Sequence, residues 1–191
     1  MATYPTQLRE GVETLSYVLS TLQKPPSQVS VAGDSAGANL AMGILSHLLH
    51  PHPEISAVRL EDPLGAAVLV SPWVTFSTDC DSVRKNWRKD MLTECMLQRH
   101  GQVFLGKREK NAWNEPLRGS VDWWAGLNTV VKEVLVTVGT DEILLDYIKQ
   151  LGERLQVSMN AVRDDTITDC ANQFSVKSPE GHHCSSGGRV A

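Results

Sequence analysis

The sequence predicts an α/β domain with a mostly parallel sheet, because short apolar runs alternate along it with amphipathic helices. Three segments have the length and composition of buried strands: Gln28–Ala32, Ala66–Val70 and Glu133–Val138. The first strand runs directly into a glycine-flanked turn and then a helix. Strand, helix and strand in this order form a βαβ unit, whose two strands lie parallel.

The two helices around the first strand are marked by apolar residues at helical spacing. The first helix begins near Pro5 and runs to about Leu22. The second follows the glycine-flanked turn and runs to about His50, where a proline stops it. His47, His50 and His52 crowd its end, and we expect them to face the helix dipole and solvent rather than to bind a metal.

The remaining elements are less regular. The continuous apolar run Ala66–Val70 predicts a strand that is buried on both faces. Residues 72–131 hold all five tryptophans and lack clear periodicity, so short, cap-like helices are expected there. One further helix follows the third strand. From residue 158 to 191 no period is visible, which predicts a poorly ordered tail after a main domain of residues 1–157.

Composition limits the classes of function. With 191 residues, 41% of them hydrophobic, the chain is long enough for one globular domain with a sizeable core. A net charge of −4 argues against electrostatic attraction to nucleic acid or to a membrane surface. The four cysteines lack metal-site spacing, and no cofactor or metal is predicted. We recognise no signal peptide and no apolar run of membrane-spanning length, which predicts a soluble, cytoplasmic protein.

The glycine-flanked turn has the Gly-x-Ser-x-Gly pattern of a nucleophile elbow, with Ser35 at the bend between Gly33 and Gly37. A serine on a sharp strand-to-helix turn has a strained backbone. Side chains two residues before it and two after it would collide with neighbouring elements, so glycine is expected at both places. The backbone N–H of Ala36, at the positive end of the following helix, would supply half of an oxyanion hole.

Residues 33–40, Gly-Asp-Ser-Ala-Gly-Ala-Asn-Leu, resemble the hormone-sensitive-lipase-like branch of the α/β-hydrolases, and most of all its fungal esterase and steryl-deacetylase-type members. The Ser-Pro-Trp at 71–73 and the Gly-Thr-Asp-Glu at 139–142 are similar to that family too. The resemblance runs from about Tyr4 to about Leu155. It implies a three-layer α/β-hydrolase fold and a serine carboxylic-ester hydrolase that acts on short acyl or acetyl esters through an acyl-enzyme.

The acid of a hydrolase triad belongs after the third strand, at the carboxyl end of the sheet, where Asp141 and Glu142 stand. The resembled family places its acid four residues before a second aspartate. Asp146 lies four residues after Glu142, which favours Glu142, whereas Gly-x-Asp spacing favours Asp141. Both residues are candidates, and the one that is not the acid is expected to cap the following helix. The acid would orient a histidine and stabilise its charged form.

The only histidines after the acid are His182 and His183, which are the candidates for the base that takes the proton from Ser35. Their spacing from the acid is longer than the family's, so a diverged tail without a working histidine is the alternative. The family also carries a His-Gly-Gly-Gly segment before its elbow, and none occurs in the 34 residues before Ser35. The sequence therefore predicts an incomplete, N-terminally truncated fold with an open sheet edge, through which the chain would self-associate.

Two rivals to ester hydrolysis stay open. One is an inactive hydrolase remnant that binds a ligand or a partner through the tryptophan-rich region, and the other is an acyltransferase that uses the same serine. Trp73, Trp87 and Trp113 are expected either to line an acyl pocket or to pack on the sheet edge. Trp123 and Trp124 stand just before the third strand and are expected to be structural.

Overall fold

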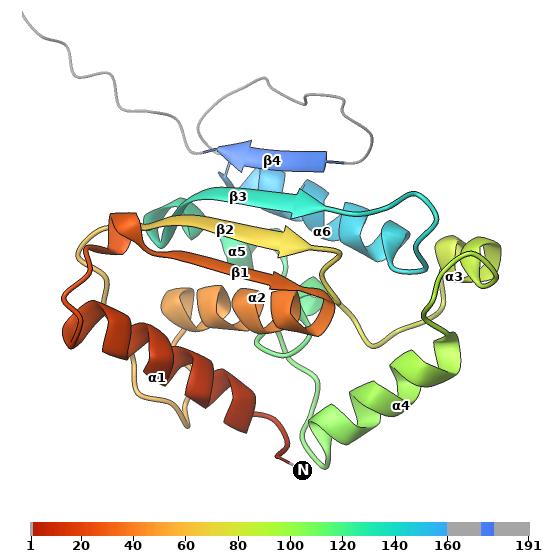
Figure 1. Cartoon of the computed structure of the whole chain (residues 1–191), viewed down its shortest axis with the longest axis horizontal. Coiled ribbons are helices and arrows are strands. Elements are labelled where there is room, and N and C mark those ends of the chain that lie inside the picture. The colour runs from red at the N-terminus through yellow and green to blue at the C-terminus, as the bar shows by residue number, and fades with distance from the viewer. Residues whose placement is uncertain (1, 160–172, 178–191) are drawn as a thin grey trace, which may run out of the picture.

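In the computed structural model, which describes residues 2–159 and 173–177, the chain forms a four-stranded sheet with helices packed against it (Figure 1). The elements in chain order are α1 (Thr6–Ser20), β1 (Ser30–Asp34), α2 (Ser35–Leu49), β2 (Leu64–Val70), α3 (Asp81–Asn86), α4 (Glu94–Leu105), α5 (Val121–Trp124), β3 (Val131–Thr137), α6 (Leu145–Met159) and β4 (Gln173–Lys177). Single 3-10 turns occupy Pro26–Gln28, Pro116–Arg118 and Leu127–Thr129.

The sheet has the strand order β1-β2-β3-β4, in which β1, β2 and β3 are parallel and β4 is antiparallel to β3. The three predicted strands are confirmed, with bounds that differ from the prediction by at most two residues. The fourth strand was not predicted, although Phe174 and Val176 alternate with polar residues there, because the segment is only five residues long and stands in a region otherwise without a clear period. Asp34 pairs with Val70 and Val70 with Thr137, so the carboxyl ends of the three parallel strands meet at one edge.

The two faces of the sheet differ in burial. On one face the paired side chains of Leu69 and Val136 are fully buried. On the other face Val68 is half-buried and Val70 is 43% exposed. The expectation that Ala66–Val70 is buried on both faces therefore holds for one face only. The reason is that α2, α5 and α6 lie behind the strands, while the face toward the viewer in Figure 1 is bare in the described part of the chain.

The core lies between this sheet face and the helices. Burial of each aliphatic side chain contributes roughly 1.5–3 kcal/mol relative to leaving it exposed. The apolar stripes predicted for α1, α2 and α6 supply much of this core, through Leu8, Val12 and Leu15, through Ile44 and Leu45, and through Ile148, Leu151 and Leu155. Leu22, expected at the end of the first stripe, lies after α1 and is 49% exposed.

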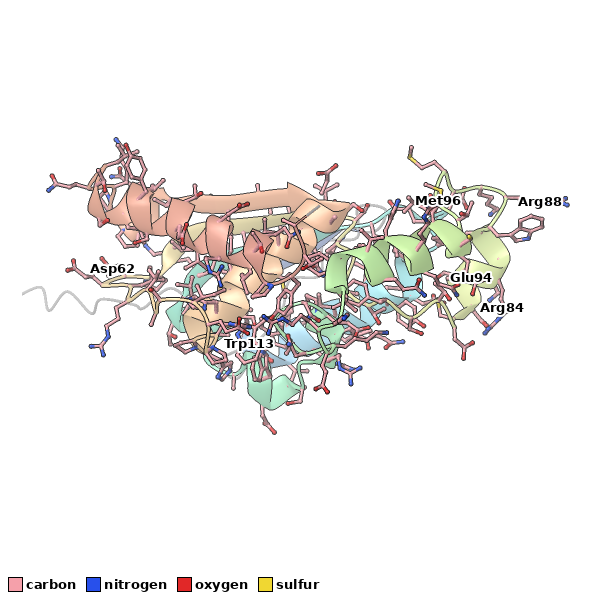
Figure 2. The ribbon with its side chains drawn as sticks, turned by 90° about the horizontal axis from the view of Figure 1, so that it is seen from below. Asp62, Arg84, Arg88, Glu94, Met96 and Trp113 are labelled. Atoms are coloured by element: carbon pink, nitrogen blue, oxygen red, sulfur yellow. The ribbon has the colours of Figure 1, made fainter. Side chains whose placement is uncertain are left out.

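The irregular region between β2 and β3 contains α3, α4 and α5. Seen from below, α4 lies toward the end of the molecule that carries Arg88, opposite the end that carries Asp62 (Figure 2). None of the helices in the described residues is long and apolar enough to cross a lipid bilayer. The division into a main domain at 1–157, a cap-like region at 72–131 and a tail at 158–191 stays a prediction.

Candidate active site

The turn between β1 and α2 has the geometry expected of an elbow. Ser35 is the first residue of α2 and has φ +48°, in the left-handed region that residues with a side chain seldom adopt. A Cβ atom at Gly33 would lie 2.3 Å from the carbonyl carbon of Gly37, so glycine is required there. A Cβ at Gly37 would lie 3.6 Å from its nearest neighbour, Asp34 Oδ1, which is ordinary contact. The prediction that a side chain would collide with its neighbours is thus confirmed at Gly33. It is wrong at Gly37, where no described atom lies too close for a Cβ.

The first N–H groups of α2 are positioned to receive a negative charge. Asp34, the N-cap residue, makes no side-chain hydrogen bond to them. The N–H groups of a helix's first turn lack intrahelical partners and carry the positive end of the helix dipole. Ala36 lines the same cavity as Ser35, which is the placement that the predicted oxyanion role requires.

A cavity of about 360 Å³ adjoins Ser35. Its walls come from four parts of the chain, namely the start of the chain through Ala2 and Gln7, the elbow with the first turns of α2, the loop after β2, and the helix α4 with its approach. Apolar side chains dominate the lining, with Trp73 and Phe76 from the loop and Leu92, Leu97, Val103 and Phe104 from α4 and its approach. Such a cavity favours an apolar group bound next to the serine.

The tryptophans divide among the expected roles. Trp73 lines the Ser35 cavity, and Trp113 lines a neighbouring cavity of about 280 Å³ that also contacts Ala36. Trp124 is fully buried, and Trp123 donates from Nε1 to Ser46 Oγ at 2.9 Å, so the structural role expected of this pair is confirmed. Trp87 lines neither cavity; it is 59% exposed.

The two candidate acids occupy different environments. Glu142 Oε1 accepts hydrogen bonds from Ser71 Oγ and from the backbone N–H of Gly139, both at 2.7 Å. Asp141 lies at the surface, where its Oδ1 is 2.8 Å from Lys89 Nζ. The Glu142 carboxylate is therefore fixed against the end of β2, beside the elbow, while Asp141 is held away by a lysine.

A short segment around α3 holds the loop of the acid. The side-chain amide of Asn86 donates to the carbonyl oxygens of Thr140 and Glu142, at 3.1 and 2.9 Å. Asp90 Oδ2 accepts from the backbone N–H of Ile143 at 2.7 Å. Because Asn86 is buried, these bonds are shielded from water. Asn86 and Asp90 were not predicted, since nothing local in the sequence joins them to the acid.

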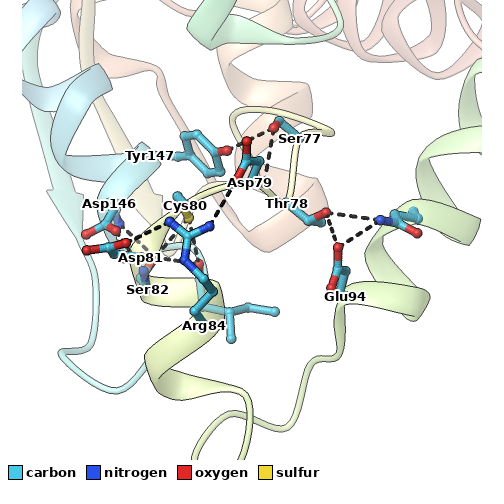
Figure 3. Close-up of polar contacts among 12 residues, drawn as sticks. Ser77, Thr78, Asp79, Cys80, Asp81, Ser82, Arg84, Glu94, Asp146 and Tyr147 are labelled. Carbon is cyan, nitrogen blue, oxygen red and sulfur yellow. Dashed lines mark hydrogen bonds and ion pairs between the residues drawn. The ribbon is translucent and has the colours of Figure 1, made fainter.

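Residues 77–82, which lead into and begin α3, are attached to the helices α4 and α6 (Figure 3). Asp146 of α6 accepts from the backbone N–H of Ser82 at 2.7 Å, and Tyr147 donates to Ser77 Oγ at 2.9 Å. On the other side, Thr78 donates to Glu94 of α4 at 2.7 Å. The second aspartate of the family pattern therefore anchors this segment.

Buried polar side chains fix the cavity wall formed by the loop after β2. Asn39 Nδ2 donates to the carbonyl oxygen of Trp73 at 2.7 Å and to that of Asn114 at 3.0 Å. Glu115, only 2% exposed, accepts from Thr75 Oγ1 at 2.7 Å and from the N–H of Phe76 at 2.8 Å. Sequence reasoning missed Glu115 because its partners are about 40 residues away.

The histidines at the end of α2 are not solvent-facing as predicted, since His47 and His52 are buried. His47 Nδ1 accepts from the backbone N–H of His52 at 3.0 Å, and its Nε2 lies 3.1 Å from the carbonyl oxygen of Ser56. Burial lowers the pKa of both imidazoles, which favours their neutral forms. Loop backbone groups therefore use these rings as hydrogen-bond partners. Within the described residues no cluster of three or more potential ligands is placed to hold a metal.

The predicted bases, His182 and His183, lie outside the described residues. A histidine that was not predicted, His100 of α4, lines the Ser35 cavity. It precedes the acid in the chain, and the expected order of serine, acid and histidine directed attention only to later residues. The assembled parts are therefore a strained serine, a free helix N-terminus, an apolar cavity and a fixed carboxylate at one edge of the sheet.

Comparison with known proteins agrees with this arrangement. Residues 1–174 match the family described as having the alpha/beta hydrolase fold. The chain is 30% identical over 154 residues to an acetyl-hydrolase of Streptomyces hygroscopicus, covering 80% of this chain and 46% of the relative. It is 28% identical over 151 residues to an esterase of Acinetobacter venetianus, covering 79% of this chain and 46% of that protein. The chain thus spans about half the length of these relatives.

Solved structures show the same fold. An esterase from the bacterial hormone-sensitive lipase family superposes with a TM-score of 0.67 at 23% identity, covering 82% of this chain and 48% of that one. A hormone-sensitive lipase from a metagenome library gives a TM-score of 0.67 at 20% identity, covering 82% and 49%. The expected fungal character and the truncation stay predictions. The elbow, the sheet topology and the family match together show that the chain belongs to the α/β-hydrolase fold family.

Proposed function

We propose that this chain carries the nucleophile of a serine carboxylic-ester hydrolase for short acyl or acetyl esters. The observation that carries the proposal is Ser35, which has a left-handed backbone at a helix N-terminus and lines an apolar cavity. Such strain persists where the surrounding structure imposes it, and it is concentrated at functional sites. The names of the two relatives, acetyl-hydrolase and esterase, support esters as the substrate class.

In this mechanism, Ser35 Oγ attacks the ester carbonyl carbon while a histidine takes the hydroxyl proton. The N–H of Ala36 stabilises the negative charge on the carbonyl oxygen. Collapse of the intermediate expels the alcohol, which receives the proton from the histidine, and leaves the acyl group on Ser35. Water, deprotonated by the same histidine, then attacks the acyl-enzyme and releases the carboxylic acid.

Glu142 is the proposed acid, because its carboxylate is fixed by two short hydrogen bonds beside the elbow. Its charge would orient the histidine and stabilise the imidazolium form. His182 or His183 is the proposed base. Asp141, paired with Lys89 at the surface, has no role in this scheme.

One observation favours a second candidate function, an inactive remnant that binds a ligand. The Ser35 cavity is lined by apolar side chains that include Trp73, which supports ligand binding through the tryptophan-rich region. The cavity beside Ser35 would then hold an ester without cleaving it.

Covalent labelling with a fluorophosphonate tests the two candidates. We expect the wild-type chain to be labelled, Ser35→Ala to lose all labelling, and Ser30→Ala, on the exposed side of β1, to keep it. Loss of labelling in His182→Ala or His183→Ala, with retention in His100→Ala, would identify the base. Absence of labelling in wild-type protein with a native circular dichroism spectrum would contradict the hydrolase proposal and support the remnant.

A further inference from the structure

The loop after α2 is held to the fold through imidazole nitrogens. Residues 51–58, which we call the histidine loop, make a single backbone–backbone hydrogen bond among the described residues, from the N–H of Ile55 to the carbonyl oxygen of His52 at 3.1 Å. Three other backbone groups of the loop contact ring nitrogens instead. The N–H of His52 donates to His47 Nδ1 at 3.0 Å, the N–H of Glu54 donates to His52 Nδ1 at 3.1 Å, and the carbonyl oxygen of Ser56 lies 3.1 Å from His47 Nε2.

These hydrogen bonds require both rings to be neutral. A ring nitrogen that accepts a hydrogen bond carries no proton, so the proton of each neutral ring is on Nε2. In His47 that Nε2–H donates to the Ser56 carbonyl oxygen. A second proton could be added only at Nδ1, where it would meet a backbone N–H. Protonation of either ring therefore replaces a hydrogen bond with a contact between two donors.

His47 lies where an added charge is costly. It is in the last turn of α2, whose negative end favours a cation, and the carbonyl oxygen of Ser56 acts in the same direction. The side chain is nevertheless fully buried. Burial outweighs the nearby carbonyl oxygen and lowers the pKa of His47. The ring would gain its proton more readily once the loop opened to water.

His52 has charged neighbours of both signs, and its side chain is 5% exposed. Burial lowers the pKa of His52, and the charges of His47, Arg108 and Arg9 lower it further. Glu54 acts in the opposite direction, and its carboxylate is paired with Arg108, with 2.6 Å between Oε1 and Nη1. The balance favours a neutral ring in the closed loop.

The ring of His52 also supports a cavity next to the elbow. It contacts the rings of Tyr4 and Trp113 edge-on, with centroid distances of 5.7 and 5.0 Å. Tyr4 and Trp113 both line the cavity of about 280 Å³ that contacts Ala36, whereas His52 does not line it. His52 therefore packs against two walls of this cavity from outside, and movement of the histidine loop would remove that support.

We propose that His47 and His52 form an acid-sensitive latch, whose protonation releases the histidine loop and removes the support of the cavity next to Ala36. In the open loop both rings are in water and bind protons at about pH 6.5. In the closed loop they bind protons only at lower pH, so the open form binds more protons in this interval. Closure is therefore complete above about pH 6.5, and each unit of pH below it favours opening by up to about tenfold per histidine. Release requires no catalysis, and its consequence for ester access rests on the proposed function.

Hydrogen exchange of the full chain between about pH 7 and about pH 5 tests the latch. Exchange rates divided by the intrinsic rates at each pH give the opening equilibrium of each segment. We expect this equilibrium to rise about tenfold or more at the lower pH for the amides of His52 and Glu54, which donate to the rings. Peptides from β2 and α6 should change by less than about threefold, because no latch residue belongs to them.

Asparagine variants assign the response to the two rings. An asparagine oxygen can accept a hydrogen bond near the position of Nδ1 but does not titrate. His47→Asn and His52→Asn should each reduce the rise in loop opening, and together they should abolish it. The matched control is His100→Asn, which removes an exposed histidine of α4 and should keep the wild-type response.

Three results would overturn the latch. One is equal loop protection at both pH values in the wild-type chain, which decides the matter even if a variant does not fold. Another is an equal rise in β2 and α6, which would mean global unfolding. The third is a wild-type response in the folded double variant. Fluorophosphonate labelling at about pH 7, where the latch is closed, reports separately on the esterase proposal.

Discussion

The elbow after β1 and the acid loop after β3 occupy the same edge of the sheet, yet they are built in different ways. The elbow is fixed by its own five residues, 33–37, because the backbone of α2 passes too close to Gly33 for a side chain. The acid loop is fixed by Asn86 and Asp90, which are more than 50 residues away in sequence.

This difference shows how a site can combine local and long-range control. Substitutions at the elbow act through backbone geometry, so their effect depends on space at the substituted position. Substitutions around the acid act through hydrogen bonds, so their effect depends on which partner is left unsatisfied in a buried place. Paired variants at each region separate the two kinds of control.

The largest effect is expected from the two neighbouring carboxylates. Glu142→Gln keeps an oxygen that accepts from Ser71 and Gly139 but removes the charge that stabilises the imidazolium. We expect the rate of fluorophosphonate labelling to fall by about 10³–10⁴-fold, with an unchanged melting temperature. Asp141→Asn should alter the rate by less than about threefold, because its surface ion pair is of little energetic consequence. A reversed order would make Asp141 the acid.

The next effect concerns the two glycines of the elbow. Gly33→Ala should lower the free energy of unfolding by about 3 kcal/mol, because its methyl group would overlap the backbone of α2. Gly37→Ala should be neutral or stabilise by up to about 1 kcal/mol, since alanine is the better helix former and the space is open. Urea unfolding with equal m-values measures both. Equal losses of unfolding free energy in Gly33→Ala and Gly37→Ala would contradict the expected difference between the two positions.

The smallest effect is expected at the support of the acid loop. Asn86→Ala removes a buried amide and leaves the carbonyl oxygens of Thr140 and Glu142 without their donor, so the free energy of unfolding should fall by about 2 kcal/mol. The labelling rate should fall roughly tenfold or more, through displacement of Glu142. Lys89→Ala, which removes only the surface pair with Asp141, should cost less than about 1 kcal/mol. A labelling rate unaffected by Asn86→Ala would limit Asn86 to a structural role.

Sequence patterns predicted those parts of the fold whose cause is local. Strands β1 to β3 follow from short apolar runs, the helices α1, α2 and α6 follow from apolar periodicity, and the elbow follows from the glycine-bracketed Ser35. Burial of β2 on only one face was not predicted, because a strand's sequence does not reveal which of its faces a helix covers. His47 was misjudged for a related reason: its loop partner, the carbonyl oxygen of Ser56, is brought close only by the fold.

The candidate site was predicted in part. Ser35 and the pair Asp141 and Glu142 were found because motif spacing identifies them. The different roles of these two carboxylates could not be predicted. Ser71 holds Glu142 inward and Lys89 pairs with Asp141 at the surface, and neither partner is part of the loop sequence. Glu115 was missed for the same reason, because an isolated glutamate in an irregular region looks like a surface residue until its partners are known.

The neighbouring strands β2 and β3 are far apart in sequence, because Ala66 of β2 pairs with Glu133 of β3. The strands β1 and β2 are closer in sequence, because Ser30 pairs with Ala66. Closure entropy rises only with the logarithm of loop length, so doubling such a connection costs roughly 0.6 kcal/mol. Insertions and deletions in this connection are therefore cheap for the sheet. The cavity walls that this connection carries can therefore vary in sequence and length at little cost to the fold, while the turn that presents the serine is constrained by the space around Gly33.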